Sequence, residues 1–435
     1  MVAMRHNNDV ELQWPNKQLS LRAAGANSYE WIHPQDSRLQ GKPFIELLGS
    51  QSPLTHEENI LVAGDGLDAV EALASEELFG KGARLVYIDP PFNTGKVFNQ
   101  YGDNLASPMW LSMMRDRLSA IRPILGEGAS VWLHLDDSEL HHARCIMDEV
   151  FGEKAYVASI VWQKRTTRES RSAFSNNHDT ILVYAPEGPK KWKQRRNLLV
   201  KNSSKLINRD NDPRGPWTDA PFTAPGYRSG QQYKIVTPSG KVLTPPRGRS
   251  WYATEPTYKH LLEDDRIWFP KDGAGAPRLK LFPNQIRGLV PFTVWLSSDV
   301  GTTDSAKKHL LKLFPDKPVF DTPKPEELLE SIIHIATDPG ELVVDLFCGS
   351  GTTAAVAQKM HRRWIVAERN YATICGCVIP RLEKVINGDD DGGVTEKVAW
   401  RGGGGYRVVR VPPRLGRKPS ASKLDDAIKK SCVMI

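Results

Sequence analysis

Short apolar runs alternate with amphipathic stretches in two separate parts of the chain. In the first part, residues 60–73 predict a strand, a glycine turn and a helix, and residues 83–92 (ARLVYIDPPF) predict a buried strand that ends in a proline-rich loop. Apolar positions at helical spacing predict a helix over 108–125, which the glycines directly after it would end. A strand over 129–137 and a helix over 138–152 follow.

The same alternation returns nearer the C-terminal end. Residues 323–336 predict an amphipathic helix, residues 341–360 predict a strand, a glycine loop and a helix, and residues 363–370 predict another strand. Strands that alternate with helices indicate an α/β fold with a parallel, doubly wound sheet. We expect both parts to contribute strands to one sheet.

The segment between residues 160 and 300 has a different pattern. Pro, Gly, Trp, Arg and Lys are frequent in it, helical periodicity is scarce, and basic residues gather in KKWKQRR, NRDNDPRGPW and TPPRGRSWY. This composition predicts a separate, irregular, basic region with interleaved aromatic residues, inserted into the regular fold.

Composition narrows the class of protein. The chain has 435 residues, more than one compact core usually holds, so two domains are expected. A net charge of +7 favours a polyanionic partner, because Lys and Arg release counterions from phosphates. Five cysteines without a framework spacing argue against a disulfide-bonded secreted domain. No apolar run reaches the ~18–20 residues of a membrane span. We therefore expect a soluble, cytoplasmic protein that does not associate with a membrane.

One candidate site is the glycine loop VVDLFCGSGTT, residues 343–353. Asp345 ends an apolar strand, Gly349 and Gly351 follow, and the next predicted strand ends in Glu368, where an acid can bind both hydroxyls of a ribose. The loop lacks the lysine of a phosphate-binding P-loop and the third glycine of a dinucleotide fingerprint. A nucleoside without a phosphate cradle is what S-adenosyl-L-methionine requires. The alternative is a tight strand–helix turn that binds nothing.

The second candidate site is the loop that follows YIDPPF. A flat, amino-bearing base could stack on Phe92, while Asp89 and the Pro90 carbonyl accept its two amino hydrogens. These acceptors would hold the nitrogen lone pair out of the ring plane, aimed at an electrophilic methyl group. The alternative is a proline-rich exit from a strand with no chemical role.

Several motifs carry a resemblance to a known family when they are taken together and in order. They are YIDPPFNTG, the helix with MWLSMMRDRL, HLDDSE, FSNNHDTILVYA, NDPRGPW, TPKP, DLFCGSGTT and GGGGYR. Over about residues 59 to 410 the chain resembles the amino-methylating DNA methyltransferases of the β group, in which the catalytic loop precedes the cofactor loop. It resembles most the adenine methyltransferases related to modification subunits of type III restriction systems.

The resemblance implies roles for individual residues. The target-base loop (DPPF motif) would consist of Asp89, Pro90, Pro91 and Phe92, and the cofactor residues would be Asp345, Phe347, Gly349, Gly351, Glu368, Thr322, Lys324 and Asp65. The family commonly has Tyr where this chain has Phe92, which keeps the stacking ring. Asp89 favours adenine N6, because relatives that act on cytosine N4 more often have Ser there.

The resemblance also implies a domain organisation. The expected parts are an N-terminal arm (1–58), the catalytic half of a Rossmann-like S-adenosylmethionine-dependent methyltransferase sheet (59–159), a target-recognition region (160–300), the cofactor half (301–410) and a C-terminal tail (411–435). The tail is equally compatible with a disordered end and a short packed helix. Expected DNA-binding residues are Lys164, Arg165, Arg168, Arg171 and Arg214.

The implied activity is site-specific methyl transfer from S-adenosyl-L-methionine to N6 of a flipped-out adenine in double-stranded DNA, in a restriction–modification or epigenetic context. Two alternatives stay open, namely a cytosine-N4 methyltransferase and a DNA-binding specificity subunit without its own activity. The family often dimerises, and its type III members partner a separate restriction subunit, so a homodimer and such a subunit are the expected protein partners.

Acids and histidines in HLDDSELHH resemble a metal site, but their spacing argues against one. His141 and His142 are adjacent on a predicted helix and point about 100° apart, so they cannot easily face one ion. Cys375 and Cys377 lack the spacing and partners of a zinc site. Methyl transfer from a sulfonium needs no metal, and we expect none.

Overall fold

The computed structural model describes residues 11–24, 28–41, 43–48, 52–94, 105–170, 173–199, 206–285 and 288–415. The chain divides into two compact units. The first consists of the residues up to Asn197 and from Phe292 onward, and the second consists of Leu198–Pro291.

A ten-stranded sheet forms the centre of the first unit, with the strand order β16-β7-β8-β6-β5-β17-β18-β4-β19-β3 among the described residues. Neighbouring strands are parallel from β6 to β19 and between β16 and β7, and β8 and β3 pair antiparallel with their neighbours. The strands are β3 (Glu46–Leu47), β4 (Ile60–Ala63), β5 (Ala83–Ile88), β6 (Leu125–Leu135), β7 (Tyr156–Gln163), β8 (His178–Tyr184), β16 (Val294–Trp295), β17 (Leu342–Asp345), β18 (Arg363–Glu368) and β19 (Arg407–Arg410).

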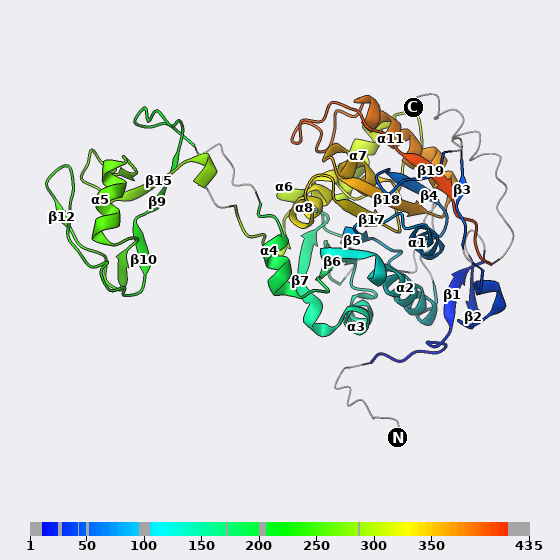
Figure 1. Ribbon diagram of the computed structural model, residues 1–435. Helices are drawn as coiled ribbons and strands as arrows, with labels where there is room; N and C mark the ends of the chain where they lie inside the picture. The colour runs from blue at the N-terminus through cyan, green and yellow to red at the C-terminus, as the bar shows by residue number, and fades with distance from the viewer. Residues whose placement is uncertain are drawn as a thin grey trace, which may run out of the picture. The chain divides into compact units, whose positions relative to one another are not determined.

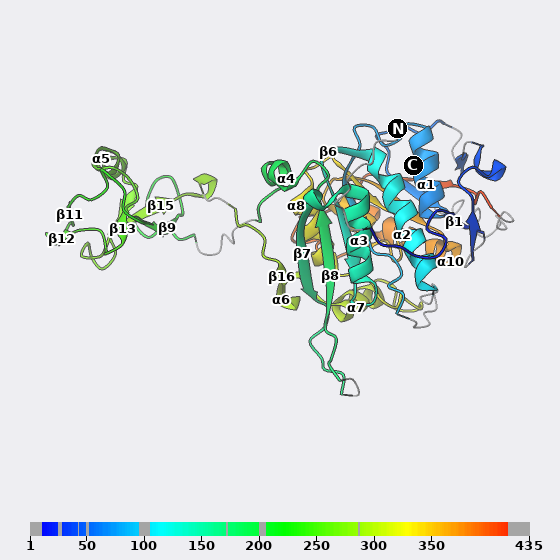
Figure 2. The ribbon, with the colours of Figure 1, turned by 90° about the horizontal axis from the view of Figure 1, so that it is seen from below.

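Helices cover both faces of this sheet (Figures 1 and 2). One face carries α1 (Gly66–Ser75), α2 (Ser107–Ile121) and α3 (Leu140–Phe151), which pack against each other in sequence order. The other face carries α8 (Glu326–Ala336), α9 (Thr352–Lys359) and α11 (Ile379–Asn387). The remaining helices are α4 (Pro189–Arg195), α6 (Ser297–Val300), α7 (Thr303–Leu313) and α10 (Tyr371–Thr373). This arrangement confirms the predicted doubly wound α/β fold.

The two parts of the sheet meet where β5 lies beside β17. Leu85 pairs with Val343, Val86 with Val344 and Tyr87 with Asp345. From β5 the chain continues to β6 on one side, and from β17 it continues to β18 on the other. This reversal of direction is the position at which open α/β sheets bind ligands, outside the carboxyl ends of the strands.

One predicted boundary is wrong. The helix expected over 108–125 ends at Ile121, and Gly126 and Gly128 lie within β6 instead of ending the helix. The cause is Pro123, which sits in a 3-10 turn (Arg122–Ile124) directly after α2. Proline has no backbone N–H to donate to the carbonyl four residues earlier, so the α-helical hydrogen bonding stops sooner than the apolar pattern indicates, although Arg122 keeps helical dihedral angles.

Part of the N-terminal arm packs on α2 within the first unit. Strands β1 (Ser20–Ala23) and β2 (Tyr29–Ile32) form an antiparallel pair, and β1 lies against α2. The indole N–H of Trp14 donates to the Ser112 hydroxyl of α2 at 2.7 Å. Residues 1–10 and most of the C-terminal tail, 416–435, lie outside the described residues.

The second unit has a small core of its own. Its members include Phe222, Trp251, Tyr258 and Ile267, which are all buried. Its elements are β9 (Thr218–Pro221), β10 (Thr223–Pro225), β11 (Ile235–Val236), β12 (Val242–Leu243), β13 (Arg249–Trp251), α5 (Glu255–Glu263), β14 (Ile267–Trp268) and β15 (Arg278–Leu281).

The compact inserted unit is narrower than the expected region 160–300. Residues 160–197 and 292–300 belong to the first unit, because β7, β8 and β16 are strands of the central sheet. Ile181, Leu182 and Val183 of β8 are buried there. The basic stretches around these strands lie in the connections and in α4, and they obscure the apolar strands in the overall composition.

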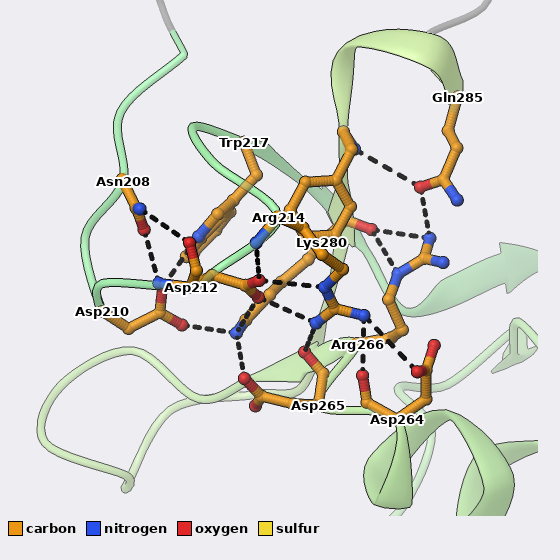
Figure 3. A network of polar contacts seen from close by, with 11 residues as sticks. Asn208, Asp210, Asp212, Arg214, Trp217, Asp264, Asp265, Arg266, Lys280 and Gln285 are labelled. Carbon is orange, nitrogen blue, oxygen red and sulfur yellow. Dashed lines mark hydrogen bonds and ion pairs between the residues drawn. The ribbon is translucent and has the colours of Figure 1, made fainter.

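A buried polar network holds the segment NRDNDPRGPW against β15 (Figure 3). The Lys280 ammonium of β15 is buried, pairs with Asp210, and donates to Asp212 at 3.2 Å and Asp265 at 2.8 Å. The Trp217 indole donates to Asp210 at 2.9 Å. A loop without regular structure is therefore fixed by charge pairs between residues that lie far apart in the sequence.

Candidate active site

A cavity of about 530 Å³ opens where β5 and β17 end. It is lined by residues of both predicted loops, and its volume falls in the range of small-molecule sites. The predicted site residues that line it are Asp65, Asp89, Pro90, Pro91, Phe92, Thr322, Lys324, Asp345, Phe347, Gly349 and Glu368. The DPPF loop and the glycine loop, which lie more than two hundred residues apart in the sequence, thus line one cavity.

The DPPF loop is held in place from the side of α2 and α3. The Trp110 indole donates to the Pro91 carbonyl at 2.7 Å, and the Asn93 amide donates to Glu139 at 2.7 Å. Asn93 has a φ of +62°, a left-handed conformation that Asn tolerates better than most residues. Residues 95–104 of the same sequence stretch lie outside the described residues.

Phe92 stacks on a buried histidine. The ring centroids of Phe92 and His134 are 6.0 Å apart and their planes differ by 25°. His134 Nδ1 lies 2.8 Å from the Tyr87 hydroxyl and its Nε2 lies 3.2 Å from Asp179 Oδ2. Lys164 donates to the other oxygen of Asp179 at 2.6 Å. This chain of contacts fixes the surface on which Phe92 rests.

Burial and neighbouring groups determine the protonation states of His134 and Asp179. Burial, together with the charge of Lys324, lowers the pKa of His134, so the ring is neutral near pH 7. Burial opposes ionisation of Asp179, but the hydrogen bond from His134 and the charge of Lys164 outweigh it and lower the pKa of Asp179 to about 2. A neutral His134 with its proton on Nε2 donates to Asp179 and accepts from Tyr87.

Lys324 lies on the target-base side of the cavity. Its ammonium donates to both carboxylate oxygens of Asp89 at 2.7 Å and lies 5.0 Å from the centroid of the Phe92 ring. The expected role of Lys324 as a cofactor residue stays a prediction.

The second loop begins with a buried carboxyl group. Asp345 accepts hydrogen bonds from the Phe347 N–H at 2.8 Å and from the Thr353 hydroxyl at 2.6 Å. Burial raises the pKa of Asp345 to about 7 in spite of these two donors, which favour the charged form. Asp345 therefore holds the loop in shape from beneath the cavity.

Glu368 and the loop glycines complete this side of the cavity. Glu368 accepts from the Gly349 N–H at 3.0 Å and the Asn370 N–H at 2.8 Å, and burial raises its pKa. Gly349 has a φ of +51°, and a Cβ there would lie 3.3 Å from the Phe320 ring. Gly351, with a φ of +78° that favours glycine, is the residue before α9 and is not one of the lining residues, so its part in cofactor binding stays a prediction.

Asp65 lies at the edge of the cavity, and its expected contact with the cofactor stays a prediction. It caps α1 by accepting from the Leu67 N–H at 3.0 Å, and its other oxygen is 2.5 Å from Arg117. Burial opposes its ionisation, but the charges of Arg117 and Arg369 outweigh burial and lower its pKa. Tyr29 of the N-terminal arm also lines the cavity, and no sequence signal pointed to it.

A buried ionic cluster supports the segments that carry Lys324 and the glycine loop. Arg381 donates to the Ser350 carbonyl at 3.2 Å, the Thr352 hydroxyl at 2.8 Å and Glu326 at 2.8 Å. The Thr352 hydroxyl in turn donates to the Lys324 carbonyl at 3.3 Å. Both segments are thereby tied to the helices behind the sheet.

The expected DNA-binding residues lie in different places. Lys164 and Arg165 line the cavity, whereas Arg168 is exposed on the connection between β7 and β8. Arg171 lies outside the described residues. Arg214 belongs to the second unit, where it donates to both oxygens of Asp212 at 2.9 and 2.8 Å and to the carbonyls of Asp264 and Asp265 (Figure 3). These bonds give Arg214 a role in holding its own loop.

Sequence reasoning missed the residues beneath Phe92. The sequence suggests only a metal-binding role for His134. Both residues nevertheless lie in the family motifs, His134 in HLDDSE and Asp179 in FSNNHD. Within the described ranges, two groups of acids and histidines have ligand atoms close enough for a metal ion, and neither includes His134. Each already holds a lysine ammonium. Lys359 pairs with Glu326 and Asp390 of one group, and Lys280 with Asp210, Asp212 and Asp265 of the other.

Comparison with known proteins assigns the family. A family model described as DNA methylase matches residues 83–374, which contain the DPPF loop and the glycine loop. The chain belongs to the DNA methylase family. This result confirms the resemblance seen in the motifs.

In the described part of the chain, none of the helices combines the length and the apolar character that a membrane crossing requires.

Several curated relatives of this DNA methylase are parts of restriction–modification systems. The Mod subunit of the type III enzyme StyLTI of Salmonella typhimurium is 31% identical over 69% of this chain and 49% of its own length. The type II methyltransferase M.EcaI of Enterobacter cloacae is 29% identical over 72% of this chain and 68% of its own length. The probable HindVI Mod subunit of Haemophilus influenzae is 26% identical over 86% of this chain and 56% of its own length. The chain thus spans about half the length of the Salmonella subunit.

Proposed function

We propose that this DNA methylase transfers a methyl group from S-adenosyl-L-methionine to N6 of an adenine flipped out of double-stranded DNA. The observation that carries the proposal is that Asp89 and Phe92 line the same cavity as Asp345, Gly349 and Glu368. Asp89 and Phe92 are suited to an amino-bearing base, and the three residues of the second loop and strand are suited to a nucleoside. The paired strands β5 and β17 hold the two groups side by side.

In this proposal the target base stacks on Phe92. Asp89 and the Pro90 carbonyl accept the two hydrogens of its exocyclic amino group. The nitrogen lone pair is then held out of the ring plane, where it forms a bond with the incoming methyl group as the bond from carbon to sulfur breaks. The nitrogen afterwards loses one proton, which passes to the Asp89 carboxylate bonded to that amino group. An amine conjugated to a base is a poor nucleophile. The rate of methyl transfer therefore depends on how well the site positions the amino nitrogen against the methyl group.

The residues on the other side fit the proposed cofactor. S-adenosyl-L-methionine supplies the electrophilic methyl group when it is bound. Glu368 keeps acceptor capacity beyond its bonds to the Gly349 and Asn370 N–H groups, as ribose hydroxyls require. Gly349 lines the cavity with backbone atoms alone, and the Phe320 ring occupies the side on which a Cβ would lie.

Lys324 must leave Asp89 before a base can bind in this way. Its ammonium now donates to both oxygens that the amino group would use, and it lies over the Phe92 ring. A carboxylate on the methionine end of the cofactor offers Lys324 another partner. We therefore propose that the cofactor binds first and the base second.

The second unit is the proposed reader of the DNA sequence. Its basic residues and exposed Tyr227 and Tyr252 suit contact with phosphates and bases. Double-stranded DNA is the proposed substrate, and a second copy of the chain and a separate restriction subunit are the proposed protein partners. The names of the Mod relatives support the last of these. Methyl transfer through this site uses no metal.

The test is nucleoside mass spectrometry of plasmid DNA incubated with the protein and S-adenosyl-L-methionine. N6-methyladenine is expected, whereas N4-methylcytosine would keep the mechanism and change the base. Asp89→Ala should abolish transfer while the protein still binds the cofactor, at least as tightly as before because Lys324 no longer has to leave Asp89. The control is Asp304→Ala, which removes another carboxylate that lines the cavity but pairs only with Lys308 in solvent. Cofactor binding by the unchanged protein without any methylated base would favour the alternative of a specificity subunit.

A further inference from the structure

The connection between β7 and β8 projects away from the central sheet (Figure 2). It spans residues 164–177, of which 164–170 and 173–177 are described. Phe174 lies on it with 93% of its surface exposed, more than any other large apolar residue in the described part of the chain. A phenylalanine that remains in water at the end of a projecting loop gains nothing for the fold, so its position calls for another explanation.

The base of this connection is part of the candidate active site. Lys164, Arg165 and Thr167 line the cavity. Lys164 donates to Asp179, which holds His134 beneath Phe92, and the Lys164 carbonyl accepts from the Thr303 N–H at the start of α7. The loop that carries Phe174 therefore begins at the edge of the cavity into which the target base would be flipped.

The residues next to Phe174 have a defined conformation. The Ser175 hydroxyl accepts from the Glu169 N–H at 2.8 Å and from the Arg165 guanidinium at 3.3 Å. Ser175 is thus joined to the opposite strand of the connection, which leaves the side chain of Phe174 outside these bonds and in solvent.

The charges of the connection suit a phosphate backbone. Its described residues include the cations Lys164, Arg165 and Arg168, against the single acid Glu169. The Nε of Arg165 is buried and lacks a hydrogen-bond partner among the described residues, so it has donor capacity for a ligand at the cavity rim. Asn176 and Asn177 beside Phe174 are exposed and can bond to base edges.

We propose that Phe174 enters the base stack of the DNA duplex and fills the space that the flipped-out target base leaves. The inference rests on the proposed function, because it needs a base in the Phe92 pocket. Extruding a base costs a few kcal/mol, and a base that stacks on an aromatic side chain regains a comparable amount. Apolar side chains that enter between bases are a general means by which proteins distort DNA.

The experiment compares Phe174→Ala with the unchanged protein on two DNA duplexes that contain the site mapped by sequencing methylated plasmid. In one duplex the target base is paired, and in the other it lies opposite an abasic position, so that little energy is needed to extrude it. On the paired duplex kcat/KM should fall about 10- to 100-fold, the value of one lost stacking contact. On the second duplex the loss should be less than about threefold.

Two further variants complete the design. Phe174→Trp should restore the activity on the paired duplex, because it keeps an aromatic face. Phe292→Ala, which removes another highly exposed phenylalanine, should not discriminate between the duplexes. An equal loss on both duplexes, or no loss on either, would overturn the inference. Absence of N6-methyladenine from plasmid incubated with the unchanged protein would overturn the proposed function, and this inference with it.

Discussion

The ammonium of Lys324 lies 2.7 Å from each carboxylate oxygen of Asp89, although 235 positions separate the two residues in the sequence. It also lies 5.0 Å from the centroid of the Phe92 ring. These are the two interactions that the proposed target base requires, hydrogen-bond donation to Asp89 and contact with the face of Phe92. Lys324 and a base therefore compete for one place.

Replacing Lys324 should make access of the base independent of the cofactor. With 2-aminopurine at the target position, the unchanged protein should show increased fluorescence only when S-adenosyl-L-methionine is bound. Lys324→Gln should show the increase without it, since a charged hydrogen bond worth roughly 1.5–3 kcal/mol no longer opposes the base. Lys307→Gln is the control, because Lys307 lines the same cavity and pairs with Asp321 at 3.8 Å, not with Asp89. Identical fluorescence of Lys324→Gln and the unchanged protein would show that the ion pair excludes nothing.

The ring beneath Phe92 should matter for turnover more than for cofactor binding. Tyr87→Phe removes the hydroxyl that bonds to His134, and His134→Ala removes the ring on which Phe92 stacks. We expect kcat to fall about 10-fold or more for His134→Ala and less for Tyr87→Phe, because small misplacements of reacting groups are costly. Calorimetric cofactor affinity should stay within about twofold. His141→Ala, an exposed neighbour, serves as the control, and a weakened cofactor affinity in Tyr87→Phe would contradict this role.

The raised pKa of Asp345 predicts a pH-dependent stability. With a folded pKa of about 7 and an ordinary value of 3.8, the fold favours the protonated carboxyl. This contribution is fully present below the ordinary pKa and is lost as the pH rises through the folded pKa. The difference in unfolding free energy between the unchanged protein and Asp345→Asn should decrease between pH 5 and 7 by a few kcal/mol, at about 1.4 per pH unit, and level off above. Urea unfolding at several pH values measures it, and parallel pH profiles of the two proteins would exclude the effect.

The buried Lys280 should be essential for the second unit. Lys280→Met leaves the carboxylates of Asp210, Asp212 and Asp265 without their shared cation. Only Asp212 of the three is buried, and it keeps its pair with Arg214, so we expect a loss of about 1–3 kcal/mol, the cost of leaving a buried hydrogen-bonding group without one of its partners. Tryptophan fluorescence during urea unfolding should report it, since Trp217 lies 5.4 Å from the Lys280 ammonium. The exposed Lys241→Met is the matched control. An unchanged transition in Lys280→Met would refute a structural role for this network.

The sequence by itself determined the elements and the two loops. Strands β4, β5, β17 and β18 and helices α1 and α9 follow from local patterns of apolar residues, and Asp89, Asp345 and Glu368 stand at strand ends that such patterns locate. The motifs also led to the correct family, since each is a short stretch whose chemistry does not depend on distant residues.

Only the tertiary structure decided which of these residues meet. The pairing of β5 with β17, the contact of Lys324 with Asp89, and the place of His134 beneath Phe92 join residues that no local period relates. The same holds for the pairing of Arg214 with Asp212, while the expected contact of Arg214 with DNA stays a prediction. It also holds for β7 and β8, which the composition assigned to the insertion and which complete the sheet. Charge pairs and strand pairings form across space, and their free energy depends on burial that sequence spacing does not reveal.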